Sequence, residues 1–410
     1  MKQANPLTIT NGRIVTPNGL VEGNLRCEDG AIVALGEPPP EARDKVVDAK
    51  GRLVTPGLVD FGIFKVDKPA LHFGGITRAA LMPDQAPPLD HPARVRFLAQ
   101  SGKPDLWVHP FAAATKSLAG DELAELALMR EAGAKAVATG RHWIADSGAM
   151  LRLLRYAAML DLVVVSHAED GALVGNAVAT AGEMASRLGL PSAPAEAEAL
   201  AVARDIALAE LAGARLHLRQ VTTRAALDLV RAAKGRGVAI TAGVTPAHFM
   251  LSDLATGEFR TFAKLSPPLR EEADRQAVIE AIGDNTIDVI ASSHDPRGPE
   301  DKRLPFADAE PGMAGAETLL PMTLSLVRDG VIDLVRAFDL IAAKPAELLG
   351  VEAGRLIEGA EADIALIDPE KPWVVDSTQM EASAGNTPFD GQGVQGRVLA
   401  LYKGGMEIHF

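Results

Sequence analysis

Residues 149–166, AMLRLLRYAAMLDLVVVS, carry the pattern that decides the fold. Ala149–Leu160 has apolar residues at helical spacing, and Leu162–Ser166 is a short apolar run typical of a buried strand. The same alternation continues along the chain in both directions. Seven further apolar runs predict strands, and they are Leu58–Val66, Ile76–Leu81, Leu106–Ala112, Ala134–Ala138, Ala214–Val221, Val238–Val244 and Ile287–Ser292.

Helical stretches separate most of these runs, among them Glu122–Glu131, Glu196–Leu211, Thr223–Lys234 and Arg275–Ile282. Eight strands that alternate with helices over roughly three hundred residues predict an α/β fold of the (β/α)₈ barrel type. A doubly wound open sheet is the alternative, but the first strand is not followed by a Gly-rich phosphate loop. In such barrels the chemistry lies at the C-terminal ends of the strands.

The two ends of the chain differ from this middle part. Alternating or β-branched segments predict strands near both termini: Leu7–Val15, Leu20–Cys27, Ala31–Leu35, Ala362–Ile367, Trp373–Asp376 and Arg397–Tyr402. The dipeptides Asn11-Gly12, Asn18-Gly19 and Asp29-Gly30 are typical of hairpin turns. We therefore expect one small β-domain built from residues 1–55 and 352–410, with the barrel formed by residues 56–351.

The composition excludes several classes of protein. The 410 residues are 47% hydrophobic and include a single cysteine, which excludes a disordered chain and a disulfide framework. The formal charge of −13, from 41 basic and 54 acidic residues, opposes binding to nucleic acid or anionic lipid. No apolar run approaches the ~20 residues of a membrane helix, and the N-terminus lacks a secretory pattern. We expect a cytoplasmic protein that binds neither nucleic acid nor membranes.

Seven short motifs occur in one order along the chain and carry a family resemblance. They are Val54–Asp60 (VTPGLVD), Ser166–Asp170 (SHAED), Thr245–Phe249 (TPAHF), Lys264–Arg270 (KLSPPLR), Gly312–Glu317 (GMAGAE), Gly359–Asp363 (GAEAD) and Asn386–Gly391 (NTPFDG). Together they resemble the cyclic amidohydrolases, and dihydroorotase in particular, over essentially the whole chain. The resemblance implies a (β/α)₈ barrel with a β-sandwich formed by both termini. It also implies a zinc-dependent hydrolysis or closure of cyclic amides.

The positions that the resemblance assigns to metal ligands have mostly lost their donor atoms. A His-x-His pair is expected on the first barrel strand, where this chain has Gly62 and Phe64. The acidic group expected on the fourth strand is Thr139, and the histidine expected on the sixth is Gln220. The histidine of the fifth strand remains as His167. Since zinc sites need three or four donors, we expect no metal and no other cofactor.

The catalytic and substrate-binding positions are changed as well. The aspartate that would shuttle the proton is Ser293, a hydroxyl that is no base near neutral pH. The expected arginine, asparagine and histidine that would contact the substrate are Val66, Asp84 and Arg297. The neighbouring His294 matches the pattern of the eighth strand, as does Pro296.

Each remaining polar residue also has a structural interpretation. His167 and His294 are most simply hydrogen-bonded core histidines, and Arg141 a solvated charge. Phe61 and Phe64 would fill the space of a metal cluster. The alternatives are a relocated metal site and a shuttle displaced to Asp295; the former would join His167 to His109, His142 and Asp146.

Three functional hypotheses follow. The first is a non-catalytic dihydroorotase-like protein of pyrimidine biosynthesis, because inactive chains that resemble this one are structural partners of aspartate carbamoyltransferase; it would also be a homo-oligomer. The second is an active zinc-dependent hydrolase of cyclic amides with a rebuilt site, using His167 and His294 with some of His109, His142, Asp295 or Asp84. The third is a sensor that binds a metabolite without turning it over.

Overall fold

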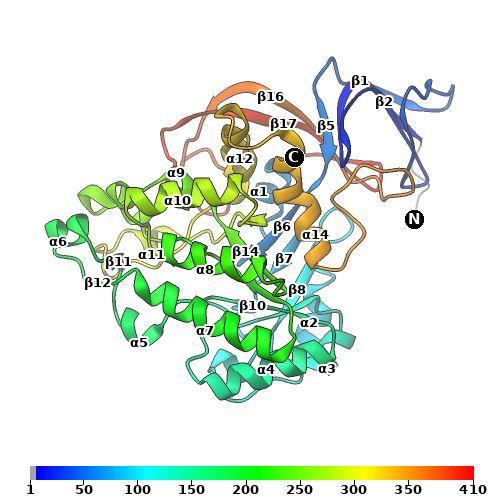
Figure 1. Ribbon diagram of the computed structural model, residues 1–410. Coiled ribbons are helices and arrows are strands. Elements are labelled where there is room, and N and C mark those ends of the chain that lie inside the picture. The colour runs from blue at the N-terminus through cyan, green and yellow to red at the C-terminus, as the bar shows by residue number, and fades with distance from the viewer. Residues whose placement is uncertain (1–5) are drawn as a thin grey trace.

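The computed structural model describes residues 6–410 and contains a parallel barrel sheet and a separate β-domain (Figure 1). Eight parallel strands pair in the order β15-β14-β13-β10-β9-β8-β7-β6, which confirms the (β/α)₈ barrel. Every predicted barrel strand overlaps one of them. Their bounds are β6 Leu58–Ile63, β7 Ile76–Leu81, β8 Trp107–Ala113, β9 Ala136–Ala138, β10 Val163–Ser166, β13 Leu216–Leu218, β14 Ile240–Val244 and β15 Val289–Ile290.

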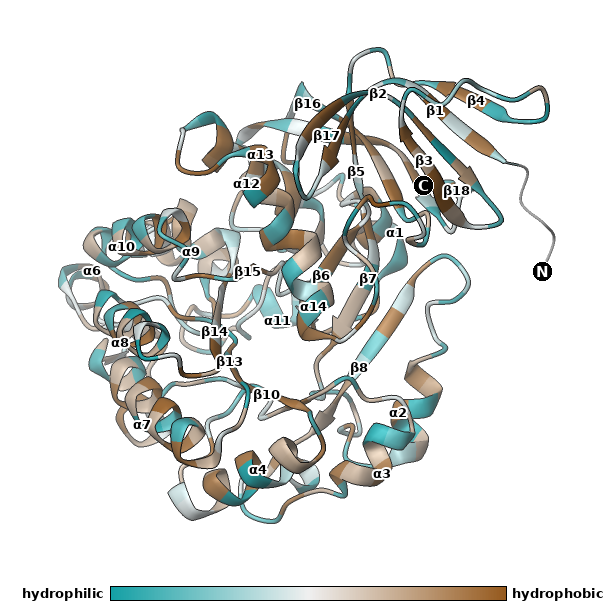
Figure 2. Cartoon of the chain, turned by 45° about the vertical axis from the view of Figure 1, so that its right-hand side comes forward, coloured by the Kyte–Doolittle hydropathy of each residue, from teal (hydrophilic) through white to brown (hydrophobic). Residues whose placement is uncertain are grey.

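Helices cover the outside of the barrel sheet, and α7 and α8 carry both hydrophobic and hydrophilic residues (Figure 2). The α-helices are α1 Lys68–Phe73, α2 Pro92–Leu98, α3 Leu126–Glu131, α4 Ser147–Met159, α5 Gly171–Val174, α6 Glu183–Leu188, α7 Glu196–Ala212, α8 Arg224–Gly235, α9 Pro246–Met250, α10 Glu272–Gly283, α11 Pro299–Lys302, α12 Leu319–Arg328, α13 Leu334–Phe338 and α14 Lys344–Leu348. No helix among the described residues is long and apolar enough to span a membrane.

Shorter elements complete the barrel layer. They are the 3₁₀ turns η1 Lys116–Leu118, η2 Asp253–Phe259, η3 Thr261–Ala263 and η4 Ala316–Thr318, the π-helix η5 Asp339–Ala343, and a two-stranded sheet of β11 Ala179–Thr180 and β12 Ser192–Ala193.

One helix begins later than predicted. The chain before α3 pairs with the preceding loop, since Glu122 accepts from the backbone of Lys116 at 2.8 Å and Leu123 forms a bridge with Thr115. These contacts hold residues 122–124 extended, so the helix starts at Leu126.

The barrel closes where β6 and β15 end, next to the expected site. The backbone N–H of Phe64 donates to the carbonyl of His294 at 2.9 Å. The backbone N–H of Ser292 donates to Asp60 Oδ1 at 2.9 Å, and its hydroxyl donates to Oδ2. Asp60 is fully buried, and burial raises the pKa of its carboxyl. These contacts fix the first and eighth strand ends against each other.

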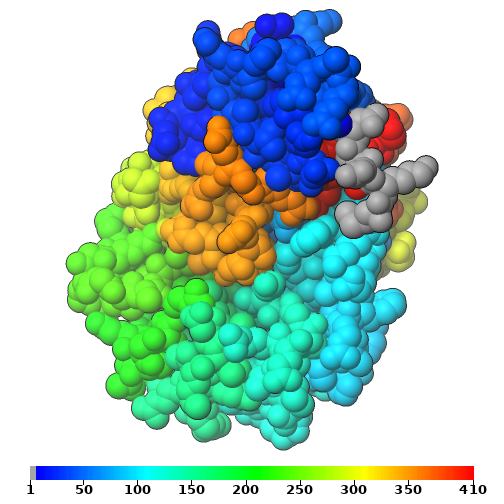
Figure 3. Space-filling model, turned by 90° about the vertical axis from the view of Figure 1, so that its right-hand side faces the viewer, coloured from blue at the N-terminus to red at the C-terminus, as the bar shows by residue number. Residues whose placement is uncertain are grey.

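The β-domain is one continuous sheet of strands from both chain ends. Its path is β18-β17-β16-β5-β1-β2-β3, with β4 paired to β1, so the parts of the expected sandwich belong to one sheet. In Figure 3 the N-terminal residues gather at one end of the molecule. The strands are β1 Leu7–Thr16, β2 Gly19–Glu28, β3 Ala31–Gly36, β4 Lys45–Asp48, β5 Leu53–Pro56, β16 Ile364–Val374, β17 Gly393–Lys403 and β18 Met406–Ile408.

Two predictions for the β-domain were wrong in detail. Asn11-Gly12 is not a hairpin turn, because it lies inside β1, where the pairing with β2 shifts register between Ile9 and Gly12. Asn11 has a φ of +54°, so the dipeptide forms a bulge. The strands predicted at 362–367 and 373–376 both overlap the single strand β16, Ile364–Val374, whose pairing with β17 shifts register twice.

The inside of the barrel is packed with side chains. Phe61 from β6 contacts Phe111 with ring centroids 5.2 Å apart, and its ring meets His217 edge-on at 4.9 Å. Small and branched residues such as Ala138 and Val165 fill the remaining volume. The barrel is therefore closed below its mouth, as close packing requires.

Candidate functional site at the barrel mouth

A small cavity lies at the mouth of the barrel, at the C-terminal ends of the strands. Its volume is about 30 Å³, which leaves room for about two water molecules. We call it the mouth cavity, and its lining residues are Phe64, Arg141, Arg219, Gln220, Thr245, His248, Leu265, Ser266, Ser293, Asp295, Pro311, Gly312 and Met313.

Phe64 occupies the place of the second expected histidine and fills much of the mouth. Its side chain is buried, and its ring faces two cations, with the guanidinium carbon of Arg141 3.7 Å from the ring centroid and that of Arg219 5.3 Å away. The first expected ligand position is Gly62, whose φ of +131° suits a residue without a side chain. Both positions of the expected pair therefore lack a donor atom.

The expected ligand positions on the fourth and sixth strands make ordinary structural hydrogen bonds. Thr139 Oγ1 accepts from the backbone N–H of His167 at 3.1 Å. Gln220 Nε2 donates to Ser293 Oγ at 3.2 Å. Ser293 itself has a φ of +47°, at the turn where the eighth strand ends.

His167 is buried and engaged at both ring nitrogens. Arg219 Nη2 lies 3.0 Å from His167 Nδ1, and Glu169 Oε2 lies 3.6 Å from Nε2. A guanidinium only donates, so Nδ1 accepts and the ring proton faces Glu169. Burial lowers the pKa of His167, which favours the neutral ring.

His294 belongs to a different set of contacts. Its Nδ1 accepts from the backbone N–H of Ala316 at 3.3 Å, and its Nε2 lies 3.7 Å from Asp67 Oδ2. Burial alone would raise the pKa of Asp67, but the nearby His294 ring and the hydrogen bond from the backbone N–H of Ser383 lower it to about 2. The two retained histidines thus have separate partners.

Asp295 is held between two arginines. Its Oδ2 accepts from Arg141 Nη2 at 2.8 Å and from Arg297 Nη2 at 3.2 Å. Asp84, in place of the expected asparagine, accepts from the backbone N–H of Arg141 at 2.9 Å. The prediction of Arg141 as a solvated charge was wrong, since its side chain lines the mouth cavity. Val66 packs half-buried against the core.

A second buried arginine, Arg270, organises a complete polar cluster beside the mouth. Arg270 Nη2 donates to Glu169 Oε1 at 3.0 Å and to Glu198 Oε2 at 3.2 Å. Its other nitrogens donate to Thr222 Oγ1 at 2.9 Å and to Thr180 Oγ1 at 3.0 Å. Every nitrogen of this guanidinium has a partner, so the cluster anchors the loops after three strands.

The residues of the possible relocated metal site do not gather. His109 is buried on β8, where burial and nearby cations lower its pKa to about 3. His142 is exposed, and Asp146 caps α4. Across residues 6–410, no three His, Cys, Asp or Glu side chains are arranged to hold a metal ion. The donors at the barrel mouth therefore do not fit the zinc that the resemblance implies.

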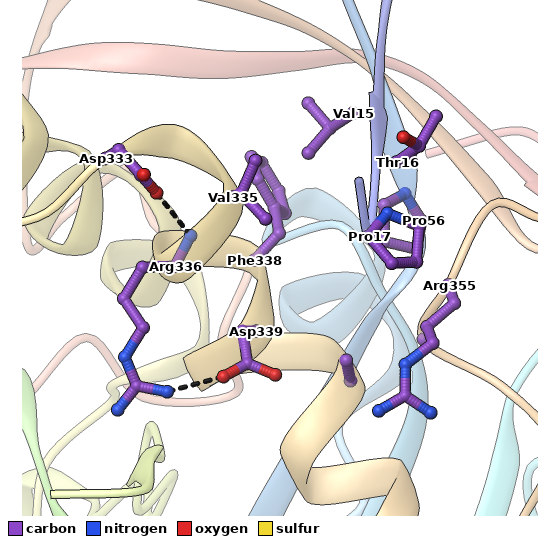
Figure 4. A pocket seen from close by; sticks show the side chains of 12 residues that line it. Val15, Thr16, Pro17, Pro56, Asp333, Val335, Arg336, Phe338, Asp339 and Arg355 are labelled. Atoms are coloured by element: carbon purple, nitrogen blue, oxygen red, sulfur yellow. Dashed lines mark hydrogen bonds and ion pairs between the residues drawn. The ribbon is translucent and has the colours of Figure 1, made fainter. Parts of the chain in front are cut away.

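Sequence reasoning missed two features. The first is Arg219, which directly follows β13; the same run also holds Arg215 and His217, so no local signal marked it. The second is a cavity of about 330 Å³ between the β-domain and the barrel helices (Figure 4). There Arg336 contacts Asp339, while Pro17 and Pro56 form the facing wall. It lies by the N-terminal end of β6, the face that in such barrels serves stability.

Comparisons with known proteins place the chain in a family. It is 39% identical over 412 residues to "Dihydroorotase" of Syntrophotalea carbinolica, which covers 96% of each chain. It is 37% identical over 418 residues to "Dihydroorotase" of Geobacter sp. (strain M21), covering 97% of this chain and 98% of that one. The chain belongs to the dihydroorotase family. The family model described as "Dihydro-orotase-like" matches residues 51–226.

Solved structures share the fold. An L-hydantoinase (dihydropyrimidinase) from Arthrobacter aurescens superposes with a TM-score of 0.88 at 24% identity, covering 99% of this chain and 96% of that one. A dihydropyrimidinase from Brevibacillus agri gives a TM-score of 0.86 at 22% identity over 98% and 95%. Taken by themselves, the names of the sequence relatives favour the hydrolase alternative over the non-catalytic one.

Proposed function

We propose that this chain is a non-catalytic member of the dihydroorotase family and a structural partner of aspartate carbamoyltransferase. One observation carries the first part: the residues at the expected ligand positions supply no metal-binding set. Gly62 and Phe64 have no donor atom, and Thr139 and Gln220 are committed to hydrogen bonds with His167 and Ser293. A single histidine is too small a set to hold zinc.

The proton transfer that the reaction needs also lacks a group to perform it. Ser293 replaces the expected aspartate, and a serine hydroxyl is no base near neutral pH. Asp295 is the nearest carboxylate in the mouth cavity, but it accepts from two guanidiniums. Small-molecule sites measure about 300–1,000 Å³, so the mouth cavity, at about 30 Å³, cannot by itself enclose a cyclic amide.

The partner assignment is supported by what the chain has kept. Its likeness to family members extends over nearly the full length, while the positions that the resemblance assigns to metal ligands and substrate contacts are mostly changed. A protein selected for its outer surface retains the fold and loses the requirements of the interior site. We propose that the chain binds aspartate carbamoyltransferase, forms homo-oligomers in that assembly, and carries no cofactor.

The test combines metal analysis, a hydrolysis assay and a binding assay on the untagged protein purified without chelator. We expect less than about 0.1 zinc per chain, no dihydroorotate hydrolysis with added zinc, and a stable complex with aspartate carbamoyltransferase by size-exclusion chromatography. Stoichiometric zinc with turnover would overturn the non-catalytic assignment. A lack of binding at micromolar concentration would overturn the partner assignment alone.

A zinc-dependent dihydroorotase with a rebuilt site is the second candidate, and the names of the relatives at up to 39% identity favour it. It requires His167 to leave its contact with Arg219. If it is correct, His167→Ala abolishes turnover, while His409→Ala, which removes an exposed imidazole outside every proposed site, leaves turnover unchanged. Equal activity of the two variants would refute it.

A further inference from the structure

The guanidinium of Arg219 is buried at the barrel mouth without a carboxylate beside it. The residue is 4% exposed, and within residues 6–410 no carboxylate oxygen lies within 4.0 Å of its nitrogens. Its side chain donates to His167 Nδ1 at 3.0 Å, and its Nε has no partner. Buried charges are normally paired because leaving water is costly for an ion.

Two of the neighbouring carboxylates are paired with other arginines: Asp295 accepts from Arg141 and Arg297, and Glu169 accepts from Arg270. The third, Asp84, accepts from the backbone N–H of Arg141 through Oδ1, and its Oδ2 has no hydrogen-bond partner. The ring of Phe64 at 5.3 Å offers Arg219 a weak cation–π contact, which replaces only part of the lost hydration. The protein itself therefore leaves one cationic donor group incompletely paired.

Arg219 lines the mouth cavity beside a hydroxyl that can bind an anion. Ser293 belongs to the same lining, and its hydroxyl accepts from Gln220 Nε2, which leaves its own proton to donate. The volume of about 30 Å³ is comparable to one carboxylate group or halide ion. Charge-assisted hydrogen bonds from guanidinium to carboxylate are among the strongest that proteins make.

A second hollow, the side cavity, adjoins the mouth cavity. Its volume is about 210 Å³, and both cavities are lined by Leu265, Ser266 and Pro311. Apolar residues such as Val178 and Ala177 form much of its remaining wall. An acid whose carboxylate reaches Arg219 would place an apolar body there.

We propose that Arg219 binds the carboxylate of a small organic acid whose apolar body lies in the side cavity. This site goes beyond the proposed function and does not depend on it. It uses Arg219, a residue of the mouth cavity, rather than a metal or the changed substrate-contact positions. Binding would neutralise the buried guanidinium.

The test is a thermal-unfolding titration with acetate and benzoate at constant ionic strength. At a hundredfold excess over the dissociation constant, we expect the melting temperature to rise by roughly 3–5 °C. Benzoate should produce the same rise in melting temperature at a concentration at least tenfold lower than acetate, because its ring is buried in the side cavity. An unchanged melting temperature would mean that water alone occupies the mouth cavity, and the proposal would be overturned.

Variants locate the effect. Arg219→Gln should abolish the response, while Arg215→Gln, which removes an exposed cation paired to Asp161, should leave it intact. An equal response in Arg219→Gln would overturn the site. Ala177→Leu narrows the side cavity and should remove only the advantage of benzoate; if that advantage persists, the body of the acid lies elsewhere.

A crystallographic arm keeps the test decisive if Arg219→Gln does not fold. Wild-type crystals soaked in bromide should show an anomalous peak beside the Arg219 guanidinium, and benzoate should displace it. Bromide at surface sites only would overturn the site. A bromide peak that benzoate fails to displace would show a site for inorganic anions and overturn the organic-acid assignment.

Discussion

Arg270 and Arg219 are both buried at the barrel mouth, yet their surroundings differ. Arg270 donates to two carboxylates and two hydroxyls, whereas Arg219 donates to a neutral imidazole and leaves its Nε without a partner. The first arrangement is what a structural ion cluster requires. The second is typical of a group whose partner comes from outside the chain. The comparison distinguishes the Arg270 cluster, which holds loops together, from the surroundings of Arg219, where an external anion could bind.

The largest expected effect is the loss of the Arg270 cluster. Arg270→Met leaves Glu169 and Glu198 buried without their cation, and we expect the free energy of unfolding to fall by about 3–5 kcal/mol. Urea denaturation at pH 7 measures it. Arg224→Met is the matched control, because Arg224 and Glu280 form an exposed pair worth about 0.5 kcal/mol. A loss below 1 kcal/mol for Arg270→Met would remove the contrast between the two arginines.

Acid should weaken the same cluster. Burial would raise the pKa of Glu169, but the nearby His167 ring and the charge and hydrogen bond of Arg270 lower it from 4.5 to about 2. A depressed pKa stabilises the fold above pH 4.5, and that contribution, about 3 kcal/mol, is lost as the pH falls toward 2.

Unfolding free energies of the wild type and Glu169→Gln measure this contribution. We expect the variant to be less stable at pH 7 and the difference to shrink progressively below pH 4.5. A difference that stays constant between pH 7 and pH 3.5 would contradict the paired state of Glu169.

The sequence predicts the scaffold well because its signals are local. The apolar run Leu162–Ser166 contains β10, and the helical spacing of Ala149–Leu160 coincides with α4 to within one residue at its C-terminal end. The loss of donor atoms at Gly62 and Phe64 can also be predicted from the sequence, since a ligand position either has a donor atom or lacks one. By contrast, Asn11-Gly12 suits both a hairpin and a bulge, and only pairing with β2 selects the bulge.

The polar pairing at the mouth depends on contacts between residues far apart in the chain. Arg270 finds Glu169 at a separation of 101 residues, and Arg141 finds Asp295 at 154. No local pattern distinguishes Arg270 from Arg219, because each is an arginine that follows a short apolar segment. Their difference lies in which loops meet, and it was therefore out of reach before the fold was known.

The ring of Phe64, which faces Arg141 and Arg219, should contribute less to the free energy of unfolding than the Arg270 cluster does. Phe64→Leu keeps an apolar side chain but removes the ring that faces Arg141 at 3.7 Å, so we expect a loss of about 1–2 kcal/mol. Urea denaturation reports it, and Phe97→Leu, at a ring that is 73% exposed, should change stability by less than about 0.5 kcal/mol. Equal effects at both positions would show that the ring has no special role at the mouth.

The smallest expected change in the free energy of unfolding is at Arg219, and it separates this residue most clearly from Arg270. Arg219→Met removes one hydrogen bond to His167, but it also removes a buried charge without a carboxylate partner. These contributions oppose each other, so in buffer free of small anions we expect stability within about 1 kcal/mol of wild type. Urea denaturation, repeated with saturating benzoate, measures the change. Benzoate should then favour the wild type alone, because only Arg219 offers it a cation. A loss of 3 kcal/mol without any anion would mean that Asp84 or Asp295 already balances the guanidinium, and that Arg219 is a structural residue like Arg270.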